Sequence, residues 1–354
     1  DEAEEGEERG GEEEHGDGEH EHEHEPAGPN NGGRLLQPTP ANMAAQRQSW
    51  EELRKLINGT INRLNATTVK PLIHKLFDEG NLIRGRGLLA KTVLRAATTS
   101  PSYADVYAAL VAVINTKLPE LGELVLARTI LQFQRAYRRR DKAQAVAAAT
   151  FLGQLFNQGM THELLCLQLL TVLLDGDPTD DSVEVAVAYM RVVGKALLEV
   201  SPAGVRAVME RFRGLLHDGS IGKRVQYQVE VLMKDRQRHF EAYPSIVPEL
   251  DLVEADDQIV FELGLDDDDL KKDEVLDVFR FDPSFVQNEA TWAKIRREIL
   301  GEDSDDDGGS SGDSDTDSSS DSGSGSDDEE ESDKEEDQEM PPAATDKKRT
   351  QVIH

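Results

Sequence analysis

The densest group of chemically useful side chains is the basic turn, residues 135–142, which places five Lys and Arg among eight residues together with Asp141. The helical pattern breaks within it, so we expect it to project from one edge of the fold between two helices. Such a cluster can grip phosphates, pair with an acidic protein surface, or pair with the acidic extension of its own chain. The alternative is a solvated turn without a ligand.

Motifs that would indicate catalysis or a cofactor fail on their context. Gly85 and Gly87 open a dinucleotide-like pattern inside a helical stretch with no preceding strand, so close packing past two glycines is the better interpretation. Residues 303–308 begin like a calcium loop but have Ser314 where the bidentate Glu is needed. The alternating His and Glu residues 20–24 lack a scaffold. We predict no enzyme activity, no cofactor and no metal site.

Three serines in the C-terminal part have acids at the next and third following positions, a context that suits acidophilic protein kinases. They are Ser304, Ser314 and Ser326. Phosphorylation would add roughly −1.5 to −2 charge at each site. An unmodified spacer that repels nucleic acid is the alternative.

The net charge of −31 is confined to two acidic arms, a net −13 over residues 1–25 and a net −18 over residues 302–339. Residues 26–247 carry 28 Lys and Arg against 20 Asp and Glu, a net +8. These shifts predict four parts: a disordered acidic tail (1–45), a folded domain (46–247), an acidic extension with short helices packed on that domain (248–300), and a disordered Ser/Asp/Glu-rich linker (301–354).

The single cysteine, Cys166, excludes a disulfide framework and a Cys-based zinc site, and fits a reducing compartment. No apolar run approaches the roughly 18–20 residues of a membrane span, and the acidic first residues are not a secretory signal. Because the chain begins at Asp1 and ends without a terminating element, we expect a segment of a longer protein.

Helical signals recur from Gln46 to about Phe240 and predict about ten helices of roughly 13–20 residues, with almost no strand. The first is expected at a capping box of Ser49 and Glu52 and has one apolar stripe. The helix at 182–198 has two stripes and belongs between neighbours. We predict an all-α fold, an α-solenoid of about five HEAT-type helical hairpins. A compact bundle of about ten helices is the competing architecture.

Residues 106–115 and 122–124 resemble the middle domain of eukaryotic translation initiation factor 4G, the MIF4G family, which has a five-repeat HEAT fold. Further stretches resemble the pre-mRNA-splicing members of that family, over about residues 48–300 in all. These stretches are 84–89, 137–139, 177–186, 223–227 and 250–254. In those members the acidic linker continues into a second helical domain of the MA-three type, expected just past His354.

The resemblance implies a non-catalytic scaffold of the spliceosome in the nucleus, without a membrane. Such proteins dock a DEAH-box helicase, and in many eukaryotes they clamp the DEAD-box helicase of the exon junction complex with its RecA lobes apart. Other spliceosome proteins and spliceosomal RNA or pre-mRNA are the further partners implied. A direct RNA-binding module based on the +8 region, and a translation-initiation-type adaptor, are the alternatives.

The family's helicase contact corresponds to Ala136, Arg140, Asp141 and Lys142, and we expect the partner-binding residues to be Ala136, Tyr137, Arg138, Arg139, Arg140, Asp141 and Lys142. The family pattern has Gly and Asn where this chain has Ala136 and Arg140. A β-carbon at position 136 is therefore expected to crowd a close backbone approach, and Arg140 exchanges an amide for a charge.

Overall fold

The computed structural model describes residues 35–268 and 270–302. These residues form eleven α-helices and four short 3₁₀ turns, and their only β structure is an isolated bridge between Thr161 and Phe261. The predicted all-α fold is confirmed. The helices are α1 (Pro40–Ile61), α2 (Val69–Glu79), α3 (Arg86–Thr99), α4 (Ala104–Lys117), α5 (Pro119–Arg138), α6 (Lys142–Asn157), α7 (Glu163–Leu174), α8 (Asp180–Val200), α9 (Pro202–Asp218), α10 (Lys223–Gln237) and α11 (Phe285–Leu300).

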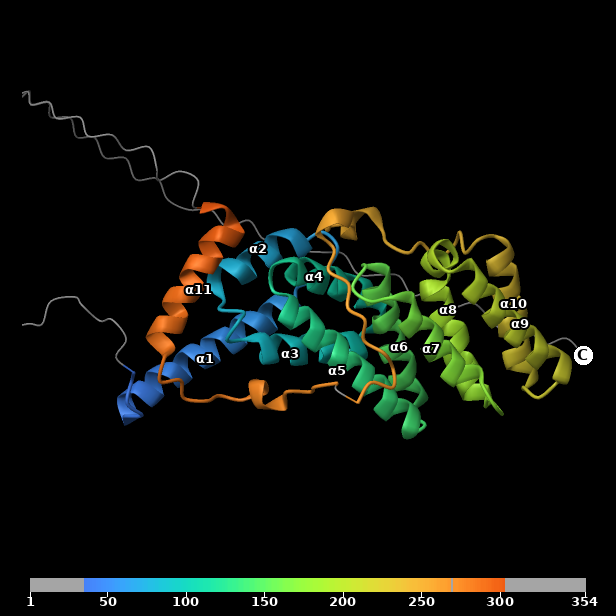
Figure 1. Ribbon diagram of the computed structural model, residues 1–354, viewed down its shortest axis with the longest axis horizontal. Coiled ribbons are helices and arrows are strands. Elements are labelled where there is room, and N and C mark those ends of the chain that lie inside the picture. The colour runs from blue at the N-terminus through green and yellow to red at the C-terminus, as the bar shows by residue number, and fades with distance from the viewer. Residues whose placement is uncertain (1–34, 269, 303–354) are drawn as a thin grey trace, which may run out of the picture. The chain divides into compact units, whose positions relative to one another are not determined.

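Helices α1 to α10 form two layers of alternate helices (Figure 1). In the even layer α2 packs on α4, α4 on α6, α6 on α8 and α8 on α10. In the odd layer α1 packs on α3, α3 on α5 and α7 on α9. Five consecutive hairpins therefore stack on their neighbours, which is a HEAT-type α-solenoid and not a compact bundle. Helix α8 lies between α6 and α10, as its two apolar stripes predict.

The first helix begins upstream of its predicted start. Thr39 Oγ1 accepts a hydrogen bond from the Asn42 amide at 3.3 Å, and Pro40 follows at the first helical position. The predicted capping box is wrong, because Ser49 lies within α1 and its hydroxyl accepts a hydrogen bond from Arg84 at 2.9 Å. Residues 40–48 form good helix but carry little apolar periodicity, so the pattern hid them.

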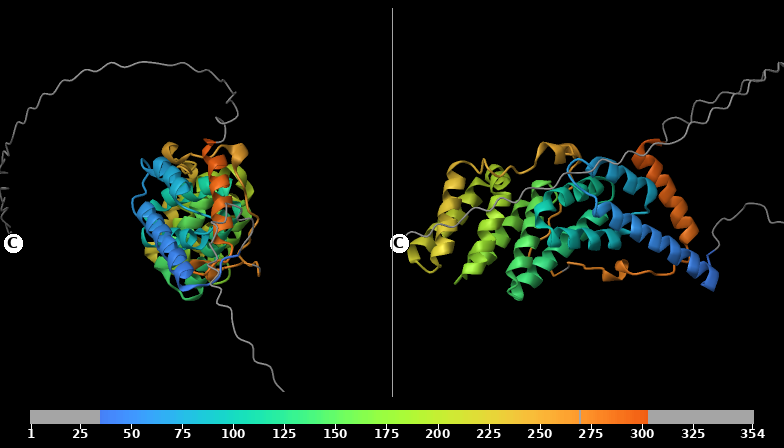
Figure 2. Two further views of the ribbon diagram at one scale, coloured as in Figure 1. Left: turned by 90° about the vertical axis from the view of Figure 1, so that its left-hand side faces the viewer. Right: turned by 180° about the vertical axis from the view of Figure 1, so that it is seen from behind.

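Residues 248–283, the strap, return from the end of α10 along the solenoid to α1 (Figures 1 and 2). Side chains of the solenoid hold its backbone at intervals: Asn115 Nδ2 donates to the Ile259 carbonyl at 2.9 Å, and Gln46 exchanges two hydrogen bonds of 2.8 and 2.9 Å with the Asp282 backbone. Where short helices are expected within residues 248–300, the strap itself forms only 3₁₀ turns, of which the longest is Glu274–Asp277.

Leu265 of the strap bridges the weakest junction of the odd layer, where α5 and α7 contact each other least. Its amide donates to Gln168 Oε1 of α7 at 2.8 Å, and its carbonyl accepts a hydrogen bond from Gln134 of α5. The side chain is 3% exposed, so burial of apolar surface adds to the two hydrogen bonds. The strap therefore joins two repeats that contact each other little directly.

After the strap, α11 packs against α2. Trp292 is buried, and Arg296 donates to the Asp78 carbonyl at 3.1 Å. Arg84 lies over the rings of Trp50 and Phe285, 5.7 and 4.8 Å from their centroids, and so fastens α1 to α11. Among the helices that the structure describes, none combines the length and apolar character of a membrane span.

Candidate functional site

The basic turn is held by the backbone bonds of a helix C-cap. The Asp141 amide donates to the Ala136 carbonyl and the Arg140 amide donates to the Tyr137 carbonyl, each at 3.0 Å. This pair of bonds ends α5 in a Schellman motif, which needs a left-handed residue after the helix. Arg140 occupies that position with φ 56°, where glycine or asparagine is usual.

Side chains fix the same turn to both of its helices and to α7. Asp141 Oδ1 accepts a hydrogen bond from the Gln144 amide at 3.2 Å and so caps α6. Tyr137 stacks on Phe133 with 6.1 Å between ring centroids, and its hydroxyl donates to the Val172 carbonyl at 3.0 Å. The turn is therefore ordered before any partner arrives.

The seven predicted partner-binding residues do not share one environment. Tyr137 and Asp141 are exposed, as are the three consecutive arginines at 138–140, which present their charges outward. Ala136 is 4% exposed, so its β-carbon packs inside the fold and not toward the edge. Its carbonyl, not its side chain, contributes to the turn.

Lys142 is engaged within the fold. Its ammonium forms ion pairs with Glu184, which is buried, and with Asp181, the latter at 2.9 Å. The hydrogen bond to Glu184 is the main reason that the pKa of Lys142 is raised above its ordinary value. Arg224 of α10 pairs with the other oxygen of Glu184, so one carboxylate joins α6, α8 and α10. Sequence reasoning missed Glu184, because at helical spacing it shares a polar strip with Arg191 and Lys195, where a solvated acid is expected.

A second charged contact that sequence reasoning missed is Arg128 of α5, which is 6% exposed. It donates to the Lys272 and Asp273 carbonyls of the strap at 2.6 and 3.0 Å, and pairs with Asp277 at 2.8 Å. A β-carbon on Gly87 would collide with the backbone of Leu276. Gly87 of the dinucleotide-like pattern thus allows close packing, and the segment that packs against it is the strap.

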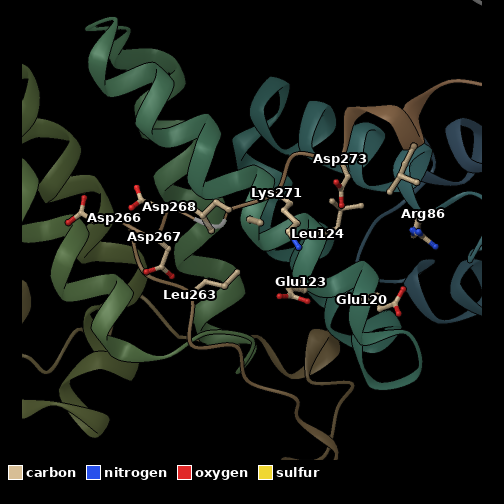
Figure 3. Close-up of a pocket in the computed structure, with 13 residues that line it drawn as sticks. Arg86, Glu120, Glu123, Leu124, Leu263, Asp266, Asp267, Asp268, Lys271 and Asp273 are labelled. Carbon is tan, nitrogen blue, oxygen red and sulfur yellow. The ribbon is translucent and has the colours of Figure 1, made fainter.

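A pocket of about 940 Å³ lies between α5 and the strap (Figure 3). Its carboxylates are all exposed: Glu120, Glu123, Asp266, Asp267, Asp268 and Asp273. Two cations, Arg86 and Lys271, also line it. Across the part of the chain with described coordinates, no group of His, Cys, Asp or Glu is placed to hold a metal ion.

Cys166 lies fully buried between α7 and α8. Its sulfur accepts a hydrogen bond from the Tyr189 hydroxyl at 3.0 Å, and desolvation raises the pKa of the thiol to about 12. A thiol in this state is not a nucleophile at neutral pH. The serine, calcium-loop and His–Glu predictions on residues 20–24, 303–308, 314 and 326 lie outside the described residues.

The stacked hairpins define a HEAT-type α-solenoid domain. The MIF4G domain family matches residues 54–239, and the chain belongs to that family. It is similar to the pre-mRNA-splicing factor CWC22 homologs of Danio rerio and Homo sapiens and to the pre-mRNA-splicing factor CWC22 of Pyricularia oryzae, with 48% identity to each. The matches cover 74%, 75% and 74% of this chain but 26%, 29% and 29% of the relatives. The resemblance to the splicing members is confirmed, and the chain spans less than a third of these relatives' length.

Proposed function

We propose that this chain is part of a non-catalytic scaffold for pre-mRNA splicing in the nucleus, and that its basic turn docks an RNA helicase. Its similarity to proteins named as pre-mRNA-splicing factors supports the splicing role. The observation that carries the docking role is the ordered turn at 138–140, whose three exposed arginines follow one another at the end of α5.

A rigid arginine cluster suits an acidic protein surface. Guanidinium groups form paired hydrogen bonds with carboxylates, and a backbone that is already ordered loses little entropy on binding. The exposed Tyr137 beside them adds an aromatic surface of the kind enriched in interfaces. The partners that the family resemblance favours are the DEAD-box helicase of the exon junction complex and a spliceosomal DEAH-box helicase.

Ala136 and Lys142 enter this proposal as positioning residues. Ala136 supplies the carbonyl that closes the turn, and Lys142 is drawn toward Glu184 and Asp181. An acidic partner could reach Lys142 only by competing with two carboxylates. Reversing the charge of Lys142 would therefore test the fold as much as the docking.

The test uses Arg139→Glu together with Arg140→Glu in the full chain. The matched control is Arg206→Glu with Lys234→Glu, two exposed positions on α9 and α10 with the same change in net charge. Each protein is used to capture helicases from nuclear extract, and mass spectrometry quantifies the DEAD-box and DEAH-box members retained. We expect the first variant to lose a helicase that the control keeps. Equal helicase capture by the unaltered chain and by both variants would contradict docking at this turn. Retention of a translation-initiation helicase would favour the translation-adaptor alternative.

A further inference from the structure

A second concentration of positive charge lies beside the basic turn, in a groove between α3, α5 and the strap. The groove has a volume of about 280 Å³. Five cations line it, Lys91, Arg95, Arg128, Arg135 and Lys272, against two acids, Glu274 and Asp277, which leaves a net +3. We call it the α3–α5 groove.

The strap neutralises only part of that charge. Asp277 pairs with Arg128 at 2.8 Å and with Lys91 at 3.8 Å. Arg95 of α3 and Arg135 of α5 are exposed, and no carboxylate of the described residues forms an ion pair with either guanidinium within 4.0 Å. The remaining positive charge fits a negatively charged segment that pairs with Arg95 and Arg135, as Asp277 pairs with Arg128 and Lys91.

The groove presents positive charge to a bound segment but few other groups that could select its sequence. No aromatic ring lines it. Thr98 donates its hydroxyl proton to the Leu94 carbonyl at 2.9 Å, and Gln132 donates to Gln144 at 3.3 Å, so the neutral polar groups already have partners in the fold. The occupant is therefore selected by its negative charge and not by base stacking or a side-chain pattern.

We infer that acidic side chains of the N-terminal tail of this chain, residues 1–25, enter the α3–α5 groove and pair with its free cations. The tail carries a net −13. The described chain starts on the strap's side of the fold, because the Leu36 amide donates to the Pro283 carbonyl at 2.7 Å. Residues 272–283 of the strap run from the groove toward this point (Figures 1 and 2).

Residues 26–35 connect the tail to the described chain. An extended chain spans roughly 3.3 Å per residue, so residues 26–35 alone bridge about 33 Å. Tethering also raises the local concentration of the tail to the millimolar range, on the order of what weak charge pairing requires. Arg135 belongs to both the groove and the basic turn, so a bound tail would shield the edge that, under the proposed function, meets the helicase.

A carbodiimide cross-linker tests this occupancy in the full chain, because it joins a carboxylate directly to a lysine in contact with it. Two of the groove's cations, Lys91 and Lys272, are lysines. We expect linked peptides between residues 1–25 and these lysines at low salt, and their loss at about 1 M salt, where charges are screened within about 3 Å. Mixing isotopically labelled and unlabelled protein identifies links within one chain.

Two variants make the result decisive. Arg95→Glu with Arg135→Glu should abolish the links, whereas the remote Arg206→Glu with Lys234→Glu should keep them. Links from residues 302–339 to the same lysines, links spread evenly over all lysines, or links that survive the groove variant would overturn the inference.

A fluorescent oligouridylate separates the tail from nucleic acid as the occupant. Replacing the acids of residues 1–25 by their amides should strengthen RNA binding by the full chain about fivefold, because a competing polyanion is removed. The gain should vanish when Arg95 and Arg135 are also reversed. Equal RNA affinity with and without the tail charges would show that the tail does not occupy the groove. This outcome is independent of helicase capture.

Discussion

The Glu184 carboxylate lies between Lys142 of α6 and Arg224 of α10 and forms an ion pair with each. Glu184 is 8% exposed, so the charge is held inside the fold by two cations that approach from neighbouring helices. Since Lys142 ends the basic turn, this contact ties the edge of the solenoid to its even layer. Removing one of these three charges by substitution leaves the other charges poorly compensated inside the fold.

Glu184→Gln keeps the shape of the side chain and removes its charge. We expect it to lower the free energy of unfolding by about 1–3 kcal/mol, less than for a fully buried pair because Arg224 is mostly exposed. Urea unfolding of the full chain measures the change. Arg206→Glu with Lys234→Glu, which touches no described ion pair, should leave the midpoint nearly unchanged. An unaltered midpoint in Glu184→Gln would show that the contact adds nothing.

The same contact predicts a pH dependence at the alkaline end. The pKa of Lys142 is raised by Glu184, so the folded state holds this proton more tightly than the unfolded state does. Its stabilising effect is complete below the ordinary lysine pKa of 10.5 and is lost as the pH rises through the folded value. The stability advantage over Lys142→Met should therefore stay constant from neutral pH to about 9 and shrink above 10.5. Urea midpoints across this range measure it, and an advantage that grows with pH would contradict the assignment.

Arg140 sits in a left-handed conformation that costs an L-residue with a full side chain about 1 kcal/mol. Arg140→Gly should relieve that cost and stabilise the chain by about 0.5–1 kcal/mol. Differential scanning calorimetry should show a higher melting temperature. Arg139→Gly is the control, because Arg139 has φ −83°, and it should not stabilise. A lower melting temperature for Arg140→Gly would rule out strain at this position.

Gly87 allows the strap to approach α3, because a β-carbon there would collide with the Leu276 backbone. Gly87→Ala should displace the strap and cost about 1–3 kcal/mol, the range of an overpacked core. Gly214→Ala on α9, where a β-carbon meets nothing within 4 Å, should stabilise its helix by about 0.5–1 kcal/mol. Hydrogen exchange should speed up around residues 272–283 only in Gly87→Ala. Unchanged exchange there would mean that the strap does not depend on this contact.

Cys166 should resist alkylation in the native chain. Burial raises its thiol pKa to about 12, so almost no thiolate exists near pH 8. Maleimide labelling followed by mass spectrometry should proceed only at the rate at which the chain opens, and should become fast in urea. Rapid stoichiometric labelling of the folded protein would contradict the buried Tyr189–Cys166 pair.

The sequence predicts the solenoid well because each helix carries its own signal. Apolar periodicity marks the segments, Pro119 and Pro202 mark helix starts, and two stripes on residues 182–198 mark a helix between neighbours. The start of α1 was hidden because residues 40–48 have helical propensity without an apolar stripe. The local sequence pattern predicts that a helix forms more reliably than it predicts the residues at which the helix begins and ends.

The charged contacts could not be predicted in the same way. Lys142 meets Glu184, and Arg128 meets Asp277, across long stretches of sequence. Nothing local tells which cations of a basic cluster face solvent and which are paired inside the fold. The sequence therefore locates the basic turn, but only the packing separates exposed Arg139 and Arg140 from paired Lys142 and buried Ala136.

Isothermal titration of the purified DEAD-box helicase into the full chain tests the central claim most directly. We predict measurable binding that Arg139→Glu with Arg140→Glu weakens by about tenfold or more, about 1.4 kcal/mol, while Arg206→Glu with Lys234→Glu leaves the affinity unchanged. The same affinity for all three proteins would contradict a scaffold that docks its helicase through the basic turn.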